Sequence, residues 1–187
     1  MMTINTAAFA YFITFRTYGT WLHGDERSST SRFNNQFGKP FIIPWKPLHN
    51  AMEDQMSEPA FTLDSSHSQT VLQSLIDTCN YNRWILYAAH VRENHAHIVL
   101  QSDATKEETM KKLKCYATKD LKKYHNELID RKHFWSRHGS TKNIWAPESL
   151  FPVLYYVIKQ QGKPIALYFD PNYYDLQNEI MYEAYFV

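Results

Sequence analysis

Two short apolar runs separated by a tight turn constrain the fold of this chain more than any other feature. The runs cover residues 84–91 and 95–101, and only Arg92-Glu93-Asn94 lies between them. A three-residue connection between two strand-like runs predicts an antiparallel β-hairpin. The two runs must then be neighbours in one sheet, and alternate residues of each run must face opposite sides of it.

The segments around this β-hairpin complete a recognisable order. The sequence predicts strands at 9–18 and 142–145, helices starting at 64–66, 105 and 146, and an extra strand or turn after 165. The second helix is expected to reach about residue 129, and the third to end at Gly162. The order strand, helix, strand, strand, helix, strand is that of the ferredoxin-like split βαβ. We therefore expect an α+β fold, with an antiparallel sheet, helices on one face and an appended C-terminal helix.

A length of 187 residues predicts one domain spanning 1–187. Residues 25–63 are rich in Asn, Ser and Pro and are expected to form a long loop inserted after the first strand. An aromatic and acidic tail occupies about 165–187. Two cysteines and the lack of a basic leader or an apolar run of about 20 residues favour a cytoplasmic protein with no membrane segment.

The β-hairpin carries two histidines at strand spacing. Because residues two apart share a face of a strand, His95 and His97 present two imidazoles side by side. Two neutral imidazoles can hold one divalent metal when a third ligand comes from elsewhere. A pair of hydrogen-bonded strand histidines without a metal would give the same pattern. Other histidines, such as His67, have no partner pattern.

The last predicted helix carries two adjacent tyrosines. Tyr155 belongs to the apolar stripe of that helix and is expected in the core, whereas Tyr156 shares another face with Gln160 one turn later. A phenol can act as a nucleophile, and a carboxamide oxygen can bind a hard metal. An amphipathic helix with a surface tyrosine is the simpler interpretation of this pattern alone.

The net charge of +1 hides an uneven distribution. Residues 104–143 contain eleven Lys or Arg and five Asp or Glu, giving +6, and the remainder carries −5. A basic helix and the loop after it could follow a phosphate backbone, or could simply form a solvated helix face. The DNA-binding candidates in this segment are Lys111, Lys112, Lys114, Lys119, Lys122, Lys123 and Arg137.

Several motifs together resemble one known family. Besides His95-Ala96-His97 and Tyr156-x-x-x-Gln160, the segments at 14–24, 90–95, 135–141 and 156–164 are similar to those of the single-tyrosine transposases of the HUH endonuclease superfamily. The likeness is greatest to the REP-associated tyrosine transposase branch of the IS200-like transposases. The resemblance covers most of the chain in the right order, except for about 25–63 and the acidic tail.

This resemblance implies a function. In the family, two histidines and a glutamine, here His95, His97 and Gln160, hold Mg²⁺ or Mn²⁺ at a scissile phosphate of single-stranded, hairpin-bearing DNA. The matching tyrosine, here Tyr156, attacks phosphorus, forms a 5′-phosphotyrosine and releases a 3′-hydroxyl that can reverse the step. The tyrosine can serve its own subunit or, in a swapped homodimer, the neighbour's, and the sequence does not decide between these arrangements.

Two hypotheses from other classes stay open at this point. A ferredoxin-like sheet can bind single-stranded nucleic acid through aromatic side chains without any catalysis. An interaction domain for proteins alone would have no salt-dependent affinity for DNA. Metal binding at His95 and His97 separates the endonuclease from both.

Overall fold

The computed structural model describes residues 8–27 and 42–175. In chain order the elements are β1 (Ala10–Thr17), α1 (Lys46–Asp54), α2 (Ser65–Asn82), β2 (Ile85–Val91), β3 (His95–Gln101), α3 (Lys106–Tyr124), β4 (Trp135–Ile144), α4 (Leu150–Lys159) and β5 (Ala166–Phe169). Short 3₁₀ helices follow α3 at Asn126–Leu128 and precede α4 at Pro147–Ser149.

The five strands form one antiparallel sheet in the order β4-β1-β3-β2-β5. The first four strands have the ferredoxin-like order, and β5 extends the sheet beyond β2. The predicted α+β fold and the β2–β3 hairpin are therefore confirmed, as is the extra strand after residue 165. The strand β3 lies at the centre of the sheet, so both of its edges are paired.

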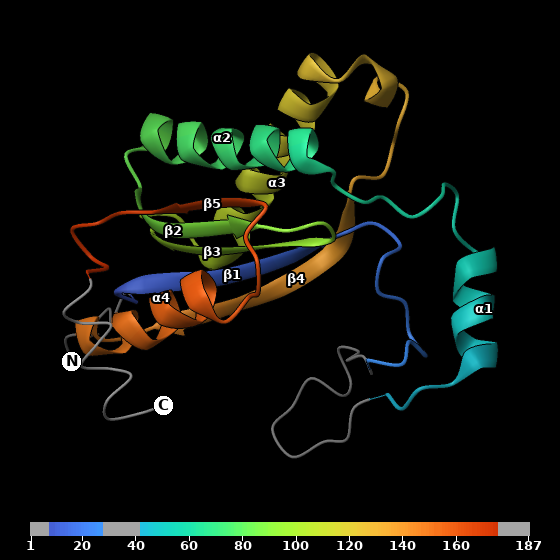
Figure 1. The fold of residues 1–187 in the computed structure, drawn as a ribbon, viewed down its shortest axis with the longest axis horizontal. Helices are drawn as coiled ribbons and strands as arrows, with labels where there is room; N and C mark the ends of the chain where they lie inside the picture. The colour runs from blue at the N-terminus through green and yellow to red at the C-terminus, as the bar shows by residue number, and fades with distance from the viewer. Residues whose placement is uncertain (1–7, 28–41, 176–187) are drawn as a thin grey trace, which may run out of the picture.

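Helices cover both faces of this sheet (Figure 1). On one face, α2 and α3 pack over a core that includes Ile13, Leu75, Ile98 and Leu113. On the other face, α4 packs over a second cluster that includes Val99. Because β3 contributes alternate residues to each cluster, the two faces of the sheet receive different side chains from the same strand.

Local signals determine where the helices on the first face begin. Asp64 caps α2 by accepting a hydrogen bond from the His67 amide at 2.7 Å. Thr105 and Glu108 form a capping box at the start of α3, which satisfies two amides that a helix start leaves unpaired. The helix α3 ends at Tyr124, five residues before the predicted end near Ile129, and a short 3₁₀ turn follows.

Two further predictions differ from the structure. The inserted segment contains the helix α1, in which Pro47 lies in the first turn, where its missing amide costs no hydrogen bond. The fourth strand begins at Trp135 rather than Lys142, because β4 is an edge strand whose mostly exposed side chains show no apolar alternation. Residues 28–41 of the insertion and 176–187 of the tail lie outside the described residues.

No helix within 8–27 and 42–175 combines the length and the apolar character needed to cross a lipid bilayer.

Candidate nuclease site

The histidine pair of β3 lies on the face of the sheet that α4 covers. The rings of His95 and His97 are 4.7 Å apart between centroids, whereas Ala96 and Ile98 point into the core under α2 and α3. The prediction that the two imidazoles share one face is therefore confirmed. His97 is buried and His95 half-buried.

Hydrogen bonds hold the same ring nitrogen in both histidines. Nδ1 of His95 donates to Asn94 Oδ1 at 2.6 Å, which leaves its Nε2 unprotonated in the neutral ring. Nδ1 of His97 lies 2.7 Å from the hydroxyl of Thr14 on β1, and donation to that oxygen leaves its Nε2 free in the same way. Fixing one nitrogen by a hydrogen bond is how proteins orient an imidazole that binds a metal through the other.

Both histidines are held in the neutral state. Burial, together with the nearby Arg92 and Arg16, lowers the pKa of His95 to about 4. Burial and the adjacent His95 lower the pKa of His97 to about 3. Neutral imidazoles are the form that binds a metal, so the pair is ready for one at neutral pH. These residues therefore fit a divalent ion.

The helix α4 places its two tyrosines in different environments. Tyr155 is 7% exposed and packs in the second core cluster, which confirms its predicted core role, whereas Tyr156 is 39% exposed. The ring of Tyr156 lies edge-on to His97, 5.7 Å between centroids, and 6.0 Å from Phe12 of β1. The structure thus brings the predicted nucleophile beside the histidine pair of the same chain.

Two glutamines follow at the end of α4, and they differ in position. Gln160 is exposed and closes the helix through its backbone amide, which donates to the Tyr156 carbonyl at 3.2 Å. The side chain of Gln161 hydrogen-bonds His97, and its Nε2 donates to the same Tyr156 carbonyl at 3.3 Å. Gln161 is therefore the glutamine that the structure brings to the histidine pair. The family resemblance assigns the ligand role to Gln160, the preceding residue.

A third histidine anchors the tyrosine helix to the sheet. His90 lies opposite His97 in the β2–β3 register, and its Nδ1 donates to the Val157 carbonyl of α4 at 2.8 Å. Since Val157 directly follows Tyr156, this hydrogen bond fixes the backbone that carries the phenol. His90 is fully buried, and burial lowers its pKa.

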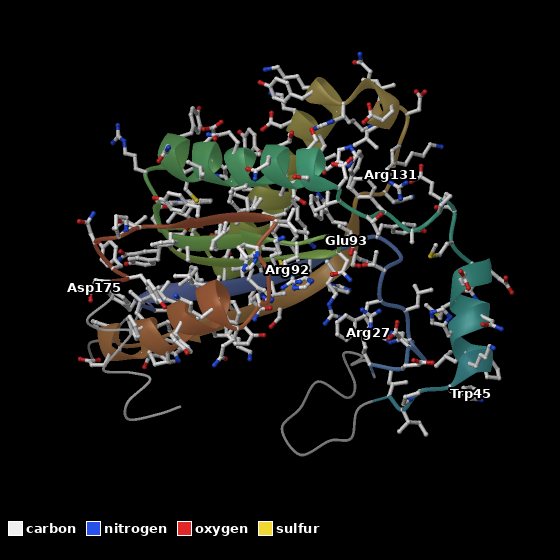
Figure 2. All side chains as sticks on the ribbon, in the orientation of Figure 1. Arg27, Trp45, Arg92, Glu93, Arg131 and Asp175 are labelled. Atoms are coloured by element: carbon white, nitrogen blue, oxygen red, sulfur yellow. The ribbon has the colours of Figure 1, made fainter. Side chains whose placement is uncertain are left out.

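Sequence reasoning missed the cations nearest the histidines. Arg16 follows Phe12 and Thr14 on the same face of β1 and pairs in register with His95. Its guanidinium lies 3.2 Å from the ring centroid of Trp21, and burial lowers its pKa to about 10. Arg92 lies at the tip of the β2–β3 hairpin (Figure 2), where it approaches Gly162 at the end of α4. The alternation of β1 could have revealed Arg16.

Comparison with known proteins finds a family likeness in the central part of the chain. Residues 58–145, which are 88 of the 187, match the family model described as "Transposase IS200 like". This IS200-like segment spans just under half of the chain. The match contains both histidines of the pair and ends before α4.

The structure is also similar to a solved one, described as the REP-associated tyrosine transposase bound to a REP hairpin. The two share 11% sequence identity over 84% of this chain and 68% of the other, with a TM-score of 0.42. No curated protein sequence matches the chain.

The basic helix α3 lies across the sheet from the histidine pair. All of α3 packs on the face opposite α4, so its lysines are separated from Tyr156 by the sheet (Figure 1). Arg137 lies on the edge strand β4 and is exposed. On α3 itself, Lys111, Lys119 and Lys123 are exposed, and Lys112 donates to Asn82 at 2.8 Å.

Two lysines of α3 bind backbone carbonyls. Lys122 donates to Ile129 at 2.9 Å. Lys114 is half-buried and donates to the carbonyls of Ser136 and His138 on β4 at 2.9 and 3.1 Å. Burial lowers the pKa of Lys114 to about 8. The ammonium of Lys114 therefore holds α3 against β4.

Proposed function

We propose that this protein is a transposase, a metal-dependent single-stranded DNA endonuclease and strand transferase that works through a covalent 5′-phosphotyrosine on Tyr156. The observation that carries the proposal is the half-exposed Tyr156 ring, 5.7 Å from a buried, neutral His97. A nucleophile beside two metal-binding imidazoles is the arrangement that phosphoryl transfer to a side chain requires.

The donor set for the metal consists of two imidazoles and one carboxamide. Nε2 of His95 and Nε2 of His97 would bind Mg²⁺ or Mn²⁺ together with a glutamine oxygen. The resemblance assigns that oxygen to Gln160, whereas the hydrogen bond to His97 favours Gln161. When bound, the ion would polarise a phosphate oxygen and neutralise charge that develops on the phosphoryl group.

The chain's own residues perform the bond changes. The Tyr156 oxygen attacks phosphorus, a Tyr–O–P bond forms, and the bond from phosphorus to the 3′-oxygen of the preceding nucleotide breaks. The tyrosine proton leaves to solvent and the 3′-oxygen gains one. Because one phosphodiester replaces another, the reverse attack by a 3′-hydroxyl rejoins DNA without ATP.

Cations around the site would hold the DNA backbone. Arg16 and Arg92 both lie close enough to His95 to lower its pKa. A third arginine, Arg27, stacks on Trp21 at 4.4 Å and is held by Asp25 at 2.6 Å. Arginines paired with an aromatic ring are suited to a phosphate followed by an unpaired base. By the family resemblance, the substrate would be a single strand flanking a DNA hairpin.

Adduct formation tests the proposal directly. The protein is incubated with Mn²⁺ and a labelled oligonucleotide containing a hairpin, and the covalent product is resolved on a denaturing gel. Tyr156→Phe should abolish the adduct. Tyr116→Phe is the matched control, because Tyr116 is 38% exposed on α3 across the sheet. If Tyr156→Phe retains the adduct while Tyr155→Phe loses it, the nucleophile is misassigned.

The same assay separates the proposal from a catalytically inactive nucleic-acid-binding module. Such a module would bind the oligonucleotide in a salt-dependent way and give no adduct with any metal. Its His95 and His97 resonances would also be unchanged by Mg²⁺.

A further inference from the structure

A second cluster of metal-binding side chains lies where the start of α2 meets the end of α3. It consists of His67 in the first turn of α2, His125 directly after α3, and Glu127 in the following 3₁₀ turn. One ligand atom of each residue lies within 4.8 Å of the other two. This cluster is on the opposite side of the sheet from His95 and His97, because α2 and α3 cover the other face.

The separations suit ligands of a single ion. Nε2 of His67 is 3.2 Å from Glu127 Oε1, and Nδ1 of His125 is 3.7 Å from the same oxygen. Ligands about 2.1 Å from a tetrahedral metal are about 3.4 Å from one another. The two observed distances to Glu127 lie on either side of that value, and the two histidine nitrogens are within 4.8 Å of each other.

The remaining ring nitrogens face oxygen acceptors. Nε2 of His125 lies 2.8 Å from the hydroxyl of Thr70, one helical turn after His67. Nδ1 of His67 lies 3.4 Å from the Asp64 carboxylate, is buried, and makes no hydrogen bond within the part of the chain that is described. Without an ion, Nε2 of His67 donates a hydrogen bond to Glu127. Moving that proton to Nδ1 of His67, with the proton of His125 on Nε2, would turn the lone pairs of both rings toward Glu127. Carboxylate or hydroxyl partners behind metal-bound histidines serve this purpose in metal sites.

We propose that His67, His125 and Glu127 form a second metal site, which takes a zinc-like transition-metal ion. Two imidazoles and a carboxylate favour Zn²⁺ over Mg²⁺, which prefers oxygen ligands. The histidine side chains are 12% and 11% exposed and that of Glu127 is 62% exposed, so water can reach a fourth position. The site ties the first turn of α2 to the end of α3. It acts in stability and takes no part in the proposed DNA chemistry.

Metal binding to a protein without the first histidine pair tests this proposal. The full-length His95→Ala/His97→Ala variant is stripped of metal and titrated with Co²⁺, which reports its coordination by visible absorption, and then with Zn²⁺. We expect one equivalent to bind, the absorption of four-coordinate cobalt, and a rise in Tm with added Zn²⁺.

Substitutions within the cluster assign the site. Adding Glu127→Gln or His125→Gln to that variant should weaken Co²⁺ binding at least about tenfold and remove the rise in Tm. His49→Gln is the matched control, because His49 faces Glu53 across 3.9 Å in the same kind of pair, with no third ligand among residues 8–27 and 42–175.

The proposal is overturned if the double variant binds no Co²⁺. It is equally overturned if binding persists undiminished in Glu127→Gln. Glu127 is exposed, so its substitution by an isosteric amide leaves the fold intact and keeps the test decisive even where a histidine variant fails to fold.

Discussion

Replacing Lys114 by Met should change the pH dependence of stability and leave DNA affinity alone. The half-buried ammonium has a pKa of about 8, against an ordinary value of 10.5. Between these values the unfolded chain binds a proton that the folded chain lacks. The free energy of unfolding therefore rises as the pH increases from about 8 to 10.5. Below about pH 8 the folded protein bears the full cost of keeping the half-buried amine charged.

The size of this effect follows from the two pKa values. With 10.5 for the unfolded chain and about 8 for the folded one, the cost of the charged Lys114 falls by about 2 kcal/mol between pH 7.5 and 9.5. Met keeps the apolar stem beside Phe15 but cannot titrate. The wild type should therefore gain about 2 kcal/mol over Lys114→Met across this interval.

Urea unfolding of both proteins at pH 7.5 and 9.5 measures the difference. Lys119→Met, an exposed neighbour on α3, should follow the wild type at both values. For DNA binding we expect the opposite, with an effect of Lys119→Met and none of Lys114→Met. Lys119→Met should reduce the slope of log Kobs against log salt by about 0.7 for a phosphate contact in a single strand, and Lys114→Met should leave the slope unchanged. A constant stability difference at the two pH values, or a reduced slope for Lys114→Met, would refute the reasoning.

Three further predictions concern the site. Gln161→Ala should lower Mn²⁺-dependent adduct formation about tenfold or more, because the Gln161 side chain hydrogen-bonds His97. Gln160→Ala should lower it much less, and equal losses in the two variants would return the ligand role to Gln160. Mixing His97→Ala with Tyr156→Phe should not restore the adduct, because the tyrosine lies beside the histidine of its own chain; restored activity would show a swapped dimer. Gly162→Ala should lower the free energy of unfolding, measured in urea, by about 1 kcal/mol, because φ is +71° at this position. The new methyl group would also lie 3.3 Å from the Arg92 guanidinium. An unchanged midpoint of urea unfolding would contradict this strain.

Periodicity predicted the elements that bury side chains. The β2–β3 hairpin, the cap of α2 at Asp64 and the separation of Tyr155 from Tyr156 all follow from patterns that burial enforces. The start of β4 was missed because a polar edge strand is determined by backbone pairing with β1 rather than by its own side chains. The helix α1 buries no residue, and its apolar stripe of Leu48, Ala51 and Met52 is too short to stand out within a segment rich in Asn, Ser and Pro.

The site was only partly predictable for a similar reason. His95 and His97 share a strand, and local spacing was enough to pair them. The alternation of β1 assigns Arg16 to one face of its strand, but only the sheet register places it beside His95. Gln161 reaches His97 through the direction of α4, which no local pattern specifies. The cluster around His67 likewise needs two helices to meet, and its members are about sixty residues apart in sequence.

Because α3 lies across the sheet from Tyr156, a DNA strand that contacts both must pass round an edge of the sheet. One such edge is β4, which pairs with β1, the neighbour of the histidine strand. Under the proposed function, a DNA hairpin held by α3 and a strand cut at Tyr156 would be connected round such an edge. The number of nucleotides between the bound DNA hairpin and the nick would then be set by the dimensions of the sheet.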